Sequence, residues 1–340
     1  IYELFLEEEI VIKDGIVAAE RKPEIVDSQG VVNTPKNIAD IIVKTTLAPL
    51  FSDEKFTEWD SYRIADICCG SGNFLLSAYE FIINRYIEYY MKNSLDMAIQ
   101  KGLLISDVGN NFKLSYEKKR EILRNNIWGV DIDILAVEVA KFSLLIKLIE
   151  DSSLYEMESF VKNNNCRILP SLDNNIKNGN SLVDEKYIEF NSNILNDPEM
   201  VEKIKIFNWE NEYYKSEVSK YETAKSDLLD KYFLFMEKGL QLLKPKGKMG
   251  YIIPHKFMLI KSGTSLRKLL SEKKCVKQII HFGTEQVFKG RSTYTCLLFV
   301  EKNERKTFEI GFVKDINKFY ATESAEMKEY PIEYLSAAPW

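Results

Sequence analysis

The strongest local signal in this chain is the stretch Asp66-Ile67-Cys68-Cys69-Gly70-Ser71-Gly72-Asn73-Phe74. The residues Arg63–Cys68 have the apolar character of a buried strand, and the residues after Gly72 carry apolar side chains at helical spacing. Two glycines at such a junction let the chain turn sharply and let a ligand approach the backbone. The stretch therefore predicts a strand, a turn and a helix, with a binding site at the carboxyl edge of a sheet. A glycine turn alone is weak evidence, because a purely structural turn shows the same pattern.

Strands and helices alternate through most of the remaining chain. Helices are expected after Thr34-Pro35, where Thr34 would cap, and after the strand 127–132; an amphipathic helix is expected over 227–243. Such alternation predicts an α/β fold with a doubly wound, mostly parallel sheet. The further strands are expected at 127–132, 176–180, 249–253, 276–282 and 294–300.

The expected organisation is one large domain with appendages. Residues 1–30 read as a helical lead-in, 31–305 as the main domain, and 306–340 as a C-terminal tail. Within the main domain, 91–125 reads as a polar helical insertion. The length of 340 residues and the 45% hydrophobic content suit this arrangement.

Composition narrows the class of protein. The five cysteines have no framework spacing and there are two histidines, so we expect reduced thiols, no metal centre and a cytoplasmic location. No apolar run is long enough to span a bilayer and no leader pattern is present, so we expect no membrane partner. The net charge of −5 is not that of a stand-alone nucleic-acid binder. If DNA is the substrate, much of the phosphate-binding surface is expected elsewhere.

Two positions refine the expected ligand. Leu75 replaces the third glycine of the dinucleotide fingerprint, which disfavours a pyrophosphate. Asp131 ends the next strand, where a carboxylate can accept both hydroxyls of a ribose, although capping the following helix would also explain it. Asn180 could bond the edge of an adenine or simply shape an Asn-Gly turn.

Several ordered motifs together carry a family resemblance, over about residues 30 to 300. In order, the motifs are Asn-Thr-Pro at 33–35, the glycine turn at 66–74, Gly-Val-Asp-Ile-Asp at 129–133, Gly-Asn-Ser-Leu at 179–182, the run Leu242–Pro254 and the run Val287–Cys296. The chain resembles the gamma-class N6-adenine DNA methyltransferases, which include the modification domains of type I and type IIG restriction enzymes. The resemblance implies the seven-stranded class I methyltransferase fold.

The resemblance also implies a cofactor, S-adenosylmethionine, and a role for each matching residue. Thr34, Asp66, Asn73 and the backbone at Gly70 and Gly72 would hold the methionine end. Asp131 would bind the ribose, Ile132 would pack on the adenine, and Asn180 would bond the amino edge of that ring.

On the substrate side, the resemblance implies a flipped adenine in double-stranded DNA. Phe288 matches the position of an aromatic residue that stacks on the target base, and Arg291 follows it. A buried position would equally explain Phe288. Relatives carry a target-recognition domain beyond this region, so a specificity domain or subunit is an expected partner, and a fused nuclease domain is another.

The central catalytic motif of the family, Asn-Pro-Pro-Tyr, is not found in the sequence. No Pro-Pro pair exists, and near 210–220 the chain reads Asn211-Glu212-Tyr213-Tyr214-Lys215 without an apolar run for a fourth strand. Because that strand is central, its loss would leave neighbouring strands unpaired. Three explanations remain open. A stretch near 210–220 is omitted from this sequence, the segment has been excised, or the protein is an inactive descendant that binds the cofactor but does not transfer methyl groups.

Two classes of function follow. One is a sequence-specific adenine-N6 DNA methyltransferase of restriction–modification or phage defence. The other is a non-catalytic cofactor-binding module of a larger defence protein. A methyltransferase of RNA or protein is a third hypothesis, because a fold alone does not determine the substrate.

Overall fold

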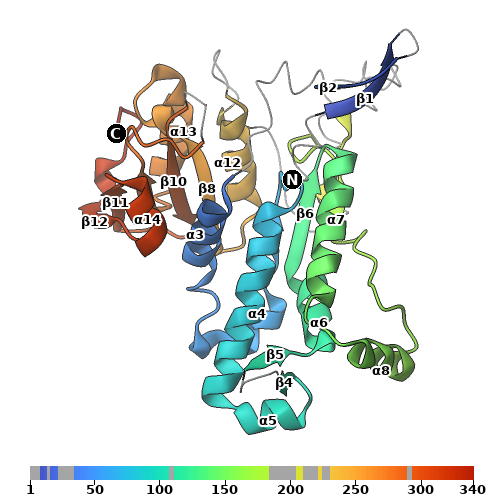
Figure 1. Ribbon diagram of the computed structural model, residues 1–340. Helices are drawn as coiled ribbons and strands as arrows, with labels where there is room; N and C mark the ends of the chain where they lie inside the picture. The colour runs from blue at the N-terminus through green and yellow to red at the C-terminus, as the bar shows by residue number, and fades with distance from the viewer. Residues whose placement is uncertain are drawn as a thin grey trace.

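The computed structural model describes residues 8–13, 16–21, 34–106, 111–183, 204–209, 221–223, 230–288 and 293–340. The expected catalytic region at 210–220 and Arg291 lie outside these ranges. In the described part, the main body consists of two sheets with helices packed against them (Figure 1).

The first sheet is parallel and three-stranded, in the order β3-β6-β7. It contains β3 (Ile64–Asp66), β6 (Ile127–Asp131) and β7 (Ile176–Asn178). The helices of this half are α4 (Asn73–Asn93), α6 (Tyr116–Asn126), α7 (Ile134–Ile149) and α8 (Leu154–Asn164), preceded by the 3-10 segment η1 (Asp53–Ser61). Apolar side chains from α4, α6 and α7 close a core over the sheet that includes Leu75, Ile82, Ile122 and Leu144. The predicted parallel strands are therefore present here.

The second sheet is mixed, in the order β12-β11-β9-β10-β8. Strand β10 is antiparallel to both β8 and β9, whereas β11 is parallel to β9. Because β8, β9 and β11 share one direction, their carboxyl ends meet at one edge. The strands are β8 (Lys248–Pro254), β9 (Val276–His281), β10 (Thr295–Glu301), β11 (Thr307–Phe312) and β12 (Glu326–Pro331); the helices are α12 (Lys231–Leu242), α13 (Thr264–Glu272) and α14 (Ile316–Thr322), with the 3-10 segments η4 (His255–Met258), η5 (Lys261–Gly263) and η6 (Ile332–Tyr334).

Helix α3 (Lys36–Leu47) joins the two halves, since it packs on both α4 and β8 (Figure 1). Its buried face contains Ile38, Ile41 and Ile42, at the helical spacing expected from the sequence. The contact with β8 is close: a Cβ at Gly250 would lie 2.4 Å from Thr46 Oγ1. A glycine at this position lets the helix lie directly on the strand.

The expected helical lead-in is wrong for the part that the structure describes. Strands β1 (Glu8–Lys13) and β2 (Ile16–Arg21) form an antiparallel hairpin, which projects from the body of the molecule (Figure 1). The sequence carries a signal for it: Asp14-Gly15 between two β-branched runs is a strong hairpin pattern.

Two other predicted segments, the insertion and the C-terminal tail, also differ from the structure. The insertion is only partly helical, because α5 (Leu95–Gln100) is followed by a small hairpin of β4 (Leu104–Ser106) and β5 (Phe112–Leu114). Residues 306–340 are not a tail: β11 and β12 extend the second sheet, and Phe308 is buried in its core. An alternating strand beyond the last family motif was missed because no resemblance covered it.

The single seven-stranded sheet is not reproduced by the described residues. Within them, β3 and β8 are end strands of separate sheets. Beyond the named strands, a parallel bridge joins Asn180 and Ile206. The expected fourth strand, which would pair with strands of both halves, falls on residues outside the described ranges.

Candidate cofactor site

The glycine turn between β3 and α4 combines close packing with open space. Gly70 and Gly72 have φ angles of +51° and +91°, a region that favours glycine. A Cβ at Gly72 would lie 3.0 Å from the Cβ of Ala140, so this glycine lets α4 approach α7. A Cβ at Gly70 would meet nothing within 4 Å. The backbone at Gly70 therefore faces space that a ligand can enter.

Asp131 ties this turn to the second strand. One carboxylate oxygen, Oδ2, accepts the Gly70 N–H at 2.8 Å, and Oδ1 accepts the Asp133 N–H at 2.9 Å. The helix cap of α7 is Asp133, whose side chain accepts the Leu135 N–H at 2.9 Å. Capping therefore does not explain Asp131. Each of its oxygens keeps acceptor capacity for a further donor such as a hydroxyl.

A second carboxylate lies beside it at the end of β3. Asp66 Oδ1 accepts the Cys68 N–H at 3.1 Å. Burial, together with the negative charge of Asp131, raises the pKa of Asp66 to about 6. Tyr251 of β8 reaches the same place, where burial and then Cys68 and Asp66 raise the pKa of its phenol. Two close carboxylates make this edge favourable for a cation.

Thr34 and Asn73 are brought together by a direct contact. Asn73 Nδ2 donates to the main-chain oxygen of Thr34 at 2.6 Å. Helix α3 begins at Lys36, with Pro35 as its N-cap and no side-chain cap. The expected capping role of Thr34 is therefore wrong, since the helix starts one residue too late for its hydroxyl.

The loop after β6 is held by residues that the sequence analysis missed. Asn178 Nδ2 donates to the main-chain oxygens of Asp131 at 3.0 Å and Ile132 at 2.9 Å. Lys205 Nζ also donates to the Ile132 oxygen, at 3.0 Å. The Ile132 side chain is left 46% exposed. A polar residue at the end of a parallel strand was the available signal for Asn178.

Asn180 shapes a turn next to this loop. Its Oδ1 accepts the Leu182 N–H at 3.1 Å, as in an ordinary Asn turn. Its own N–H donates to the Lys205 oxygen at 2.6 Å. Trp209 Nε1 donates to Ser181 O at 3.0 Å, and the Tyr221 hydroxyl donates to Leu182 O at 2.8 Å. The described residues on both sides of 210–220 are thus anchored on this turn.

Phe288 is half-buried and packs against the core cluster that contains Phe282, Val287 and Phe299. Phe74, in the first turn of α4, packs on the same cluster. Phe288 and the first turn of α4, where the methionine end of the cofactor is expected, therefore pack on one shared core cluster.

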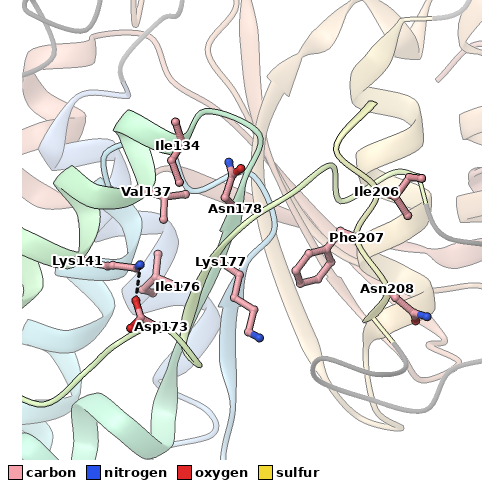
Figure 2. A pocket seen from close by; sticks show the side chains of 10 residues that line it. All are labelled: Ile134, Val137, Lys141, Asp173, Ile176, Lys177, Asn178, Ile206, Phe207 and Asn208. Carbon is pink, nitrogen blue, oxygen red and sulfur yellow. Dashed lines mark hydrogen bonds and ion pairs between the residues drawn. The ribbon is translucent and has the colours of Figure 1, made fainter. Parts of the chain in front are cut away.

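A pocket of about 310 Å³ lies beside β7 (Figure 2). None of the predicted cofactor residues lines this pocket. Asn178, which the sequence analysis did not select, does line it. Lys141 and Asp173 form an ion pair at its wall, 2.7 Å apart. We place the candidate site at the carboxyl edge of β3 and β6, because the open glycine turn and both carboxylates lie there. The residues that line the pocket are Ile134, Val137, Lys141, Asp173, Ile176, Lys177, Asn178, Ile206, Phe207 and Asn208.

A parallel sheet whose carboxyl edge combines a glycine turn with an acid on the next strand defines a Rossmann-like, nucleotide-binding class of domain. A family model described as "MmeI, DNA-methyltransferase domain" matches residues 55–239, more than half of the chain. The chain belongs to this family of DNA-methyltransferase domains. A second model, "Eco57I restriction-modification methylase", matches residues 205–288.

Known proteins agree with this assignment. The type II restriction enzyme and methyltransferase RM.Eco57I of Escherichia coli is 36% identical over 362 residues, which cover 100% of this chain and 35% of the relative. The chain thus spans about a third of that protein. Two solved structures share the fold at TM-scores of 0.54 and 13% identity. The first is a nuclease-deletion mutant of the Type ISP enzyme LlaGI in complex with a DNA substrate mimic; the match covers 89% of this chain and 26% of the LlaGI chain. The second is a DrdV–DNA complex; the match covers 88% of this chain and 30% of the DrdV chain.

No helix among the described residues has the length and apolar composition that a membrane span requires. Nor do these residues bring together three or more histidine, cysteine or acidic side chains in an arrangement that could hold a metal ion.

Proposed function

We propose that this chain is the cofactor-binding domain of a restriction–modification DNA methyltransferase that acts on N6 of adenine, with S-adenosylmethionine as the methyl donor. The observation that carries the proposal is the link from Asp131 to the open turn at Gly70, at 2.8 Å. The family assignment supports DNA methylation, and the motifs shared with the gamma class support adenine as the target.

The residues at this edge fit S-adenosylmethionine. The open space at Gly70 admits a ligand against the backbone, and Asp131 has acceptor capacity left for ribose hydroxyls. The exposed Ile132 offers an apolar surface to an adenine ring. Asp66 and Asp131 together favour a positively charged ligand, which suits a sulfonium and an ammonium group.

The chain's own groups divide the work of binding and positioning. Asp131 would bind the ribose, Asn180 would bond the adenine edge, and Asp66 would attract the cationic end, assisted by Thr34 and Asn73. Asn178 would position Asp131 by holding its main-chain oxygen. When bound, S-adenosylmethionine supplies an electrophilic methyl group. Phe288 would stack on a flipped adenine, and Arg291 would bind a phosphate or the base edge.

The second candidate, a non-catalytic cofactor-binding module, rests only on the absence of an Asn-Pro-Pro-Tyr motif from the sequence, and the family match and the relative do not favour it. That motif would accept the hydrogens of the target amine. The alignment with the Escherichia coli relative runs over 362 residues, against 340 in this chain, so the relative has positions without a counterpart here. The partners proposed for the whole protein are double-stranded DNA, a specificity domain or subunit, and a nuclease domain.

Isothermal titration calorimetry with S-adenosylmethionine tests the binding site. Asp131→Ala should weaken binding by about 1.5–3 kcal/mol, the range for hydrogen bonds to a charged group. Asp133→Ala is the matched control, because it removes the cap of α7 and leaves the proposed ribose acceptor in place. Equal affinities of wild type and Asp131→Ala would contradict the ribose assignment.

Methyl transfer and mass separate the two candidate functions. A protein with an intact mass of 39.5 kDa that binds the cofactor but transfers no tritiated methyl group to DNA would be the non-catalytic module. A mass several kilodaltons higher, together with methylated adenine in the product, would support the enzyme.

A further inference from the structure

A row of four neighbouring rings, of which three are stacked and the fourth is tilted by 38°, lies at the carboxyl edge of the second sheet. It runs Phe312–His281–His255–Tyr294, with ring centroids 5.1, 4.4 and 5.9 Å apart. The planes of His255 and His281 differ by 21°, and those of His255 and Tyr294 by 9°. The two histidines are the only ones in the chain. None of these rings belongs to the cofactor site described above.

Strand register builds this row. Phe312 is the direct neighbour of His281 across β11 and β9. On the other side Pro254 is paired with Thr295 across β8 and β10, so His255 and Tyr294 are the next residues beyond that pair. The His255 N–H donates to the Tyr294 oxygen at 3.1 Å, which fixes the two backbones together. Rings from four strand ends are therefore held at defined positions.

The inner rings are neutral at physiological pH. Burial, and then the neighbouring His255, lower the pKa of His281 to about 4. Burial also lowers the pKa of His255. Gly283 N–H donates to His281 Nδ1 at 2.8 Å, which orients that imidazole. Burial thus disfavours a charge on either imidazole, and the hydrogen bond fixes the His281 ring against which His255 stacks.

The outer rings are open to solvent but differ in their surroundings. Tyr294 is 39% exposed and Phe312 is 56% exposed. Phe312 is paired in the register with the exposed Glu326, whose carboxylate would repel a phosphate chain. Tyr294 directly precedes β10, and its neighbour across the sheet is His255 and not an acid. Of the two outer rings, Tyr294 is therefore the one that a phosphate chain can approach without a carboxylate paired beside it.

We propose that the Tyr294 ring, braced by His255 and His281, is a stacking surface for an unpaired DNA base other than the target adenine. This inference rests on the proposed function and extends it to a second base contact. Base stacking on an aromatic ring tolerates any base, because every base has a flat π face. A flipped target leaves an unpaired partner base in the duplex, which is the chemistry that such a surface fits.

The test measures, by fluorescence anisotropy at low salt, how the full chain binds a fluorescein-labelled duplex in which one thymine faces an abasic position and is therefore unpaired. Tyr294→Leu keeps an apolar side chain and removes the flat ring, and it should weaken binding about 5- to 150-fold, the range for a lost base–aromatic stack. Tyr294→Phe keeps the ring and should bind like wild type. Tyr155→Leu removes an 80% exposed aromatic on α8 and is the remote control.

Failure of this inference can be told from failure of the proposed function. Asp131→Ala should lower the affinity for S-adenosylmethionine and leave the binding of this duplex unchanged, and Tyr294→Leu should do the reverse. Duplex affinity equal to wild type in a folded Tyr294→Leu protein would overturn the stacking surface, as would a loss equalled by Phe312→Leu or Tyr155→Leu. A wild-type chain that does not bind the duplex would overturn it as well.

Discussion

At the scale of one residue, Asp66 shows that a buried carboxylate suited to binding a cationic ligand lowers the stability of the folded protein. Burial and the charge of Asp131 raise the pKa of Asp66 from 3.8 to about 6. The folded protein therefore holds a proton between these pH values that the unfolded chain releases. The contribution of Asp66 to stability is therefore largest below about pH 3.8 and is lost as the pH rises through about 6. At neutral pH the ionised side chain costs folding free energy, which a cationic ligand would recover.

Asp66→Asn should therefore raise the free energy of unfolding at pH 7.5, by about 1–3 kcal/mol after solvent screening. The gain should disappear at pH 4, where the wild-type carboxyl is protonated. Denaturant unfolding at the two pH values measures both effects. Asp173→Asn is the control, because a hydrogen bond from Lys141 lowers the pKa of Asp173 and its removal should not stabilise. A less stable Asp66→Asn protein at pH 7.5 would refute this account.

Some residues of the candidate site can be predicted from residue type and position alone. Asp131, Gly70 and Asn73 were selected by type and position, and the structure places them at one edge of the sheet. Asn178 was missed, because its amide bonds main-chain oxygens of a neighbouring strand. That role exists only after the strands have paired.

At the scale of an element, the packing of α3 on β8 requires a glycine at position 250. A Cβ at Gly250 would lie 2.4 Å from Thr46 Oγ1 and 2.9 Å from Ile42 Cγ2. Gly250→Ala should therefore destabilise the protein by the cost of overpacking, about 1–3 kcal/mol. Thermal unfolding should show a lower midpoint.

A second substitution makes this test specific. Thr46 Oγ1 is buried and has no hydrogen-bond partner among the described residues, so Thr46→Ala alone should be neutral or slightly stabilising. Combined with Gly250→Ala it should recover part of the loss, since it removes the closest contact. Purely additive effects of the two substitutions would show that the contact is not the cause.

At the scale of the whole molecule, the C-terminal region is part of the fold. Strand β11 covers the edge of β9, and the Arg267 guanidinium donates to the Ala337 oxygen at 3.0 Å. A chain that ends at Arg305 would expose the edge of β9 and leave this buried arginine without one acceptor. We expect it to unfold at a lower temperature and to aggregate.

The chain 34–340 is the matched truncation, because the hairpin that it lacks projects from the body (Figure 1). Its unfolding midpoint should stay close to that of the full chain. Differential scanning fluorimetry and size-exclusion chromatography compare the three proteins. A soluble 1–305 chain with an unchanged unfolding midpoint would show that residues 306–340 do not stabilise the fold.

The parallel strand–turn–helix units, the glycine turn and the acid at the end of the next strand can be predicted from the sequence. These features depend on local periodicity and on residues with special backbone or hydrogen-bonding properties, which neighbours in the chain reveal. Three other features emerge only when the chain is folded: two sheets share α3, β11 and β12 extend the second sheet, and Asp133 rather than Asp131 caps α7. The ring row of Tyr294, His255, His281 and Phe312 is a fourth. Such arrangements arise from register and packing between segments far apart in the chain, and periodicity within a segment carries no information about them.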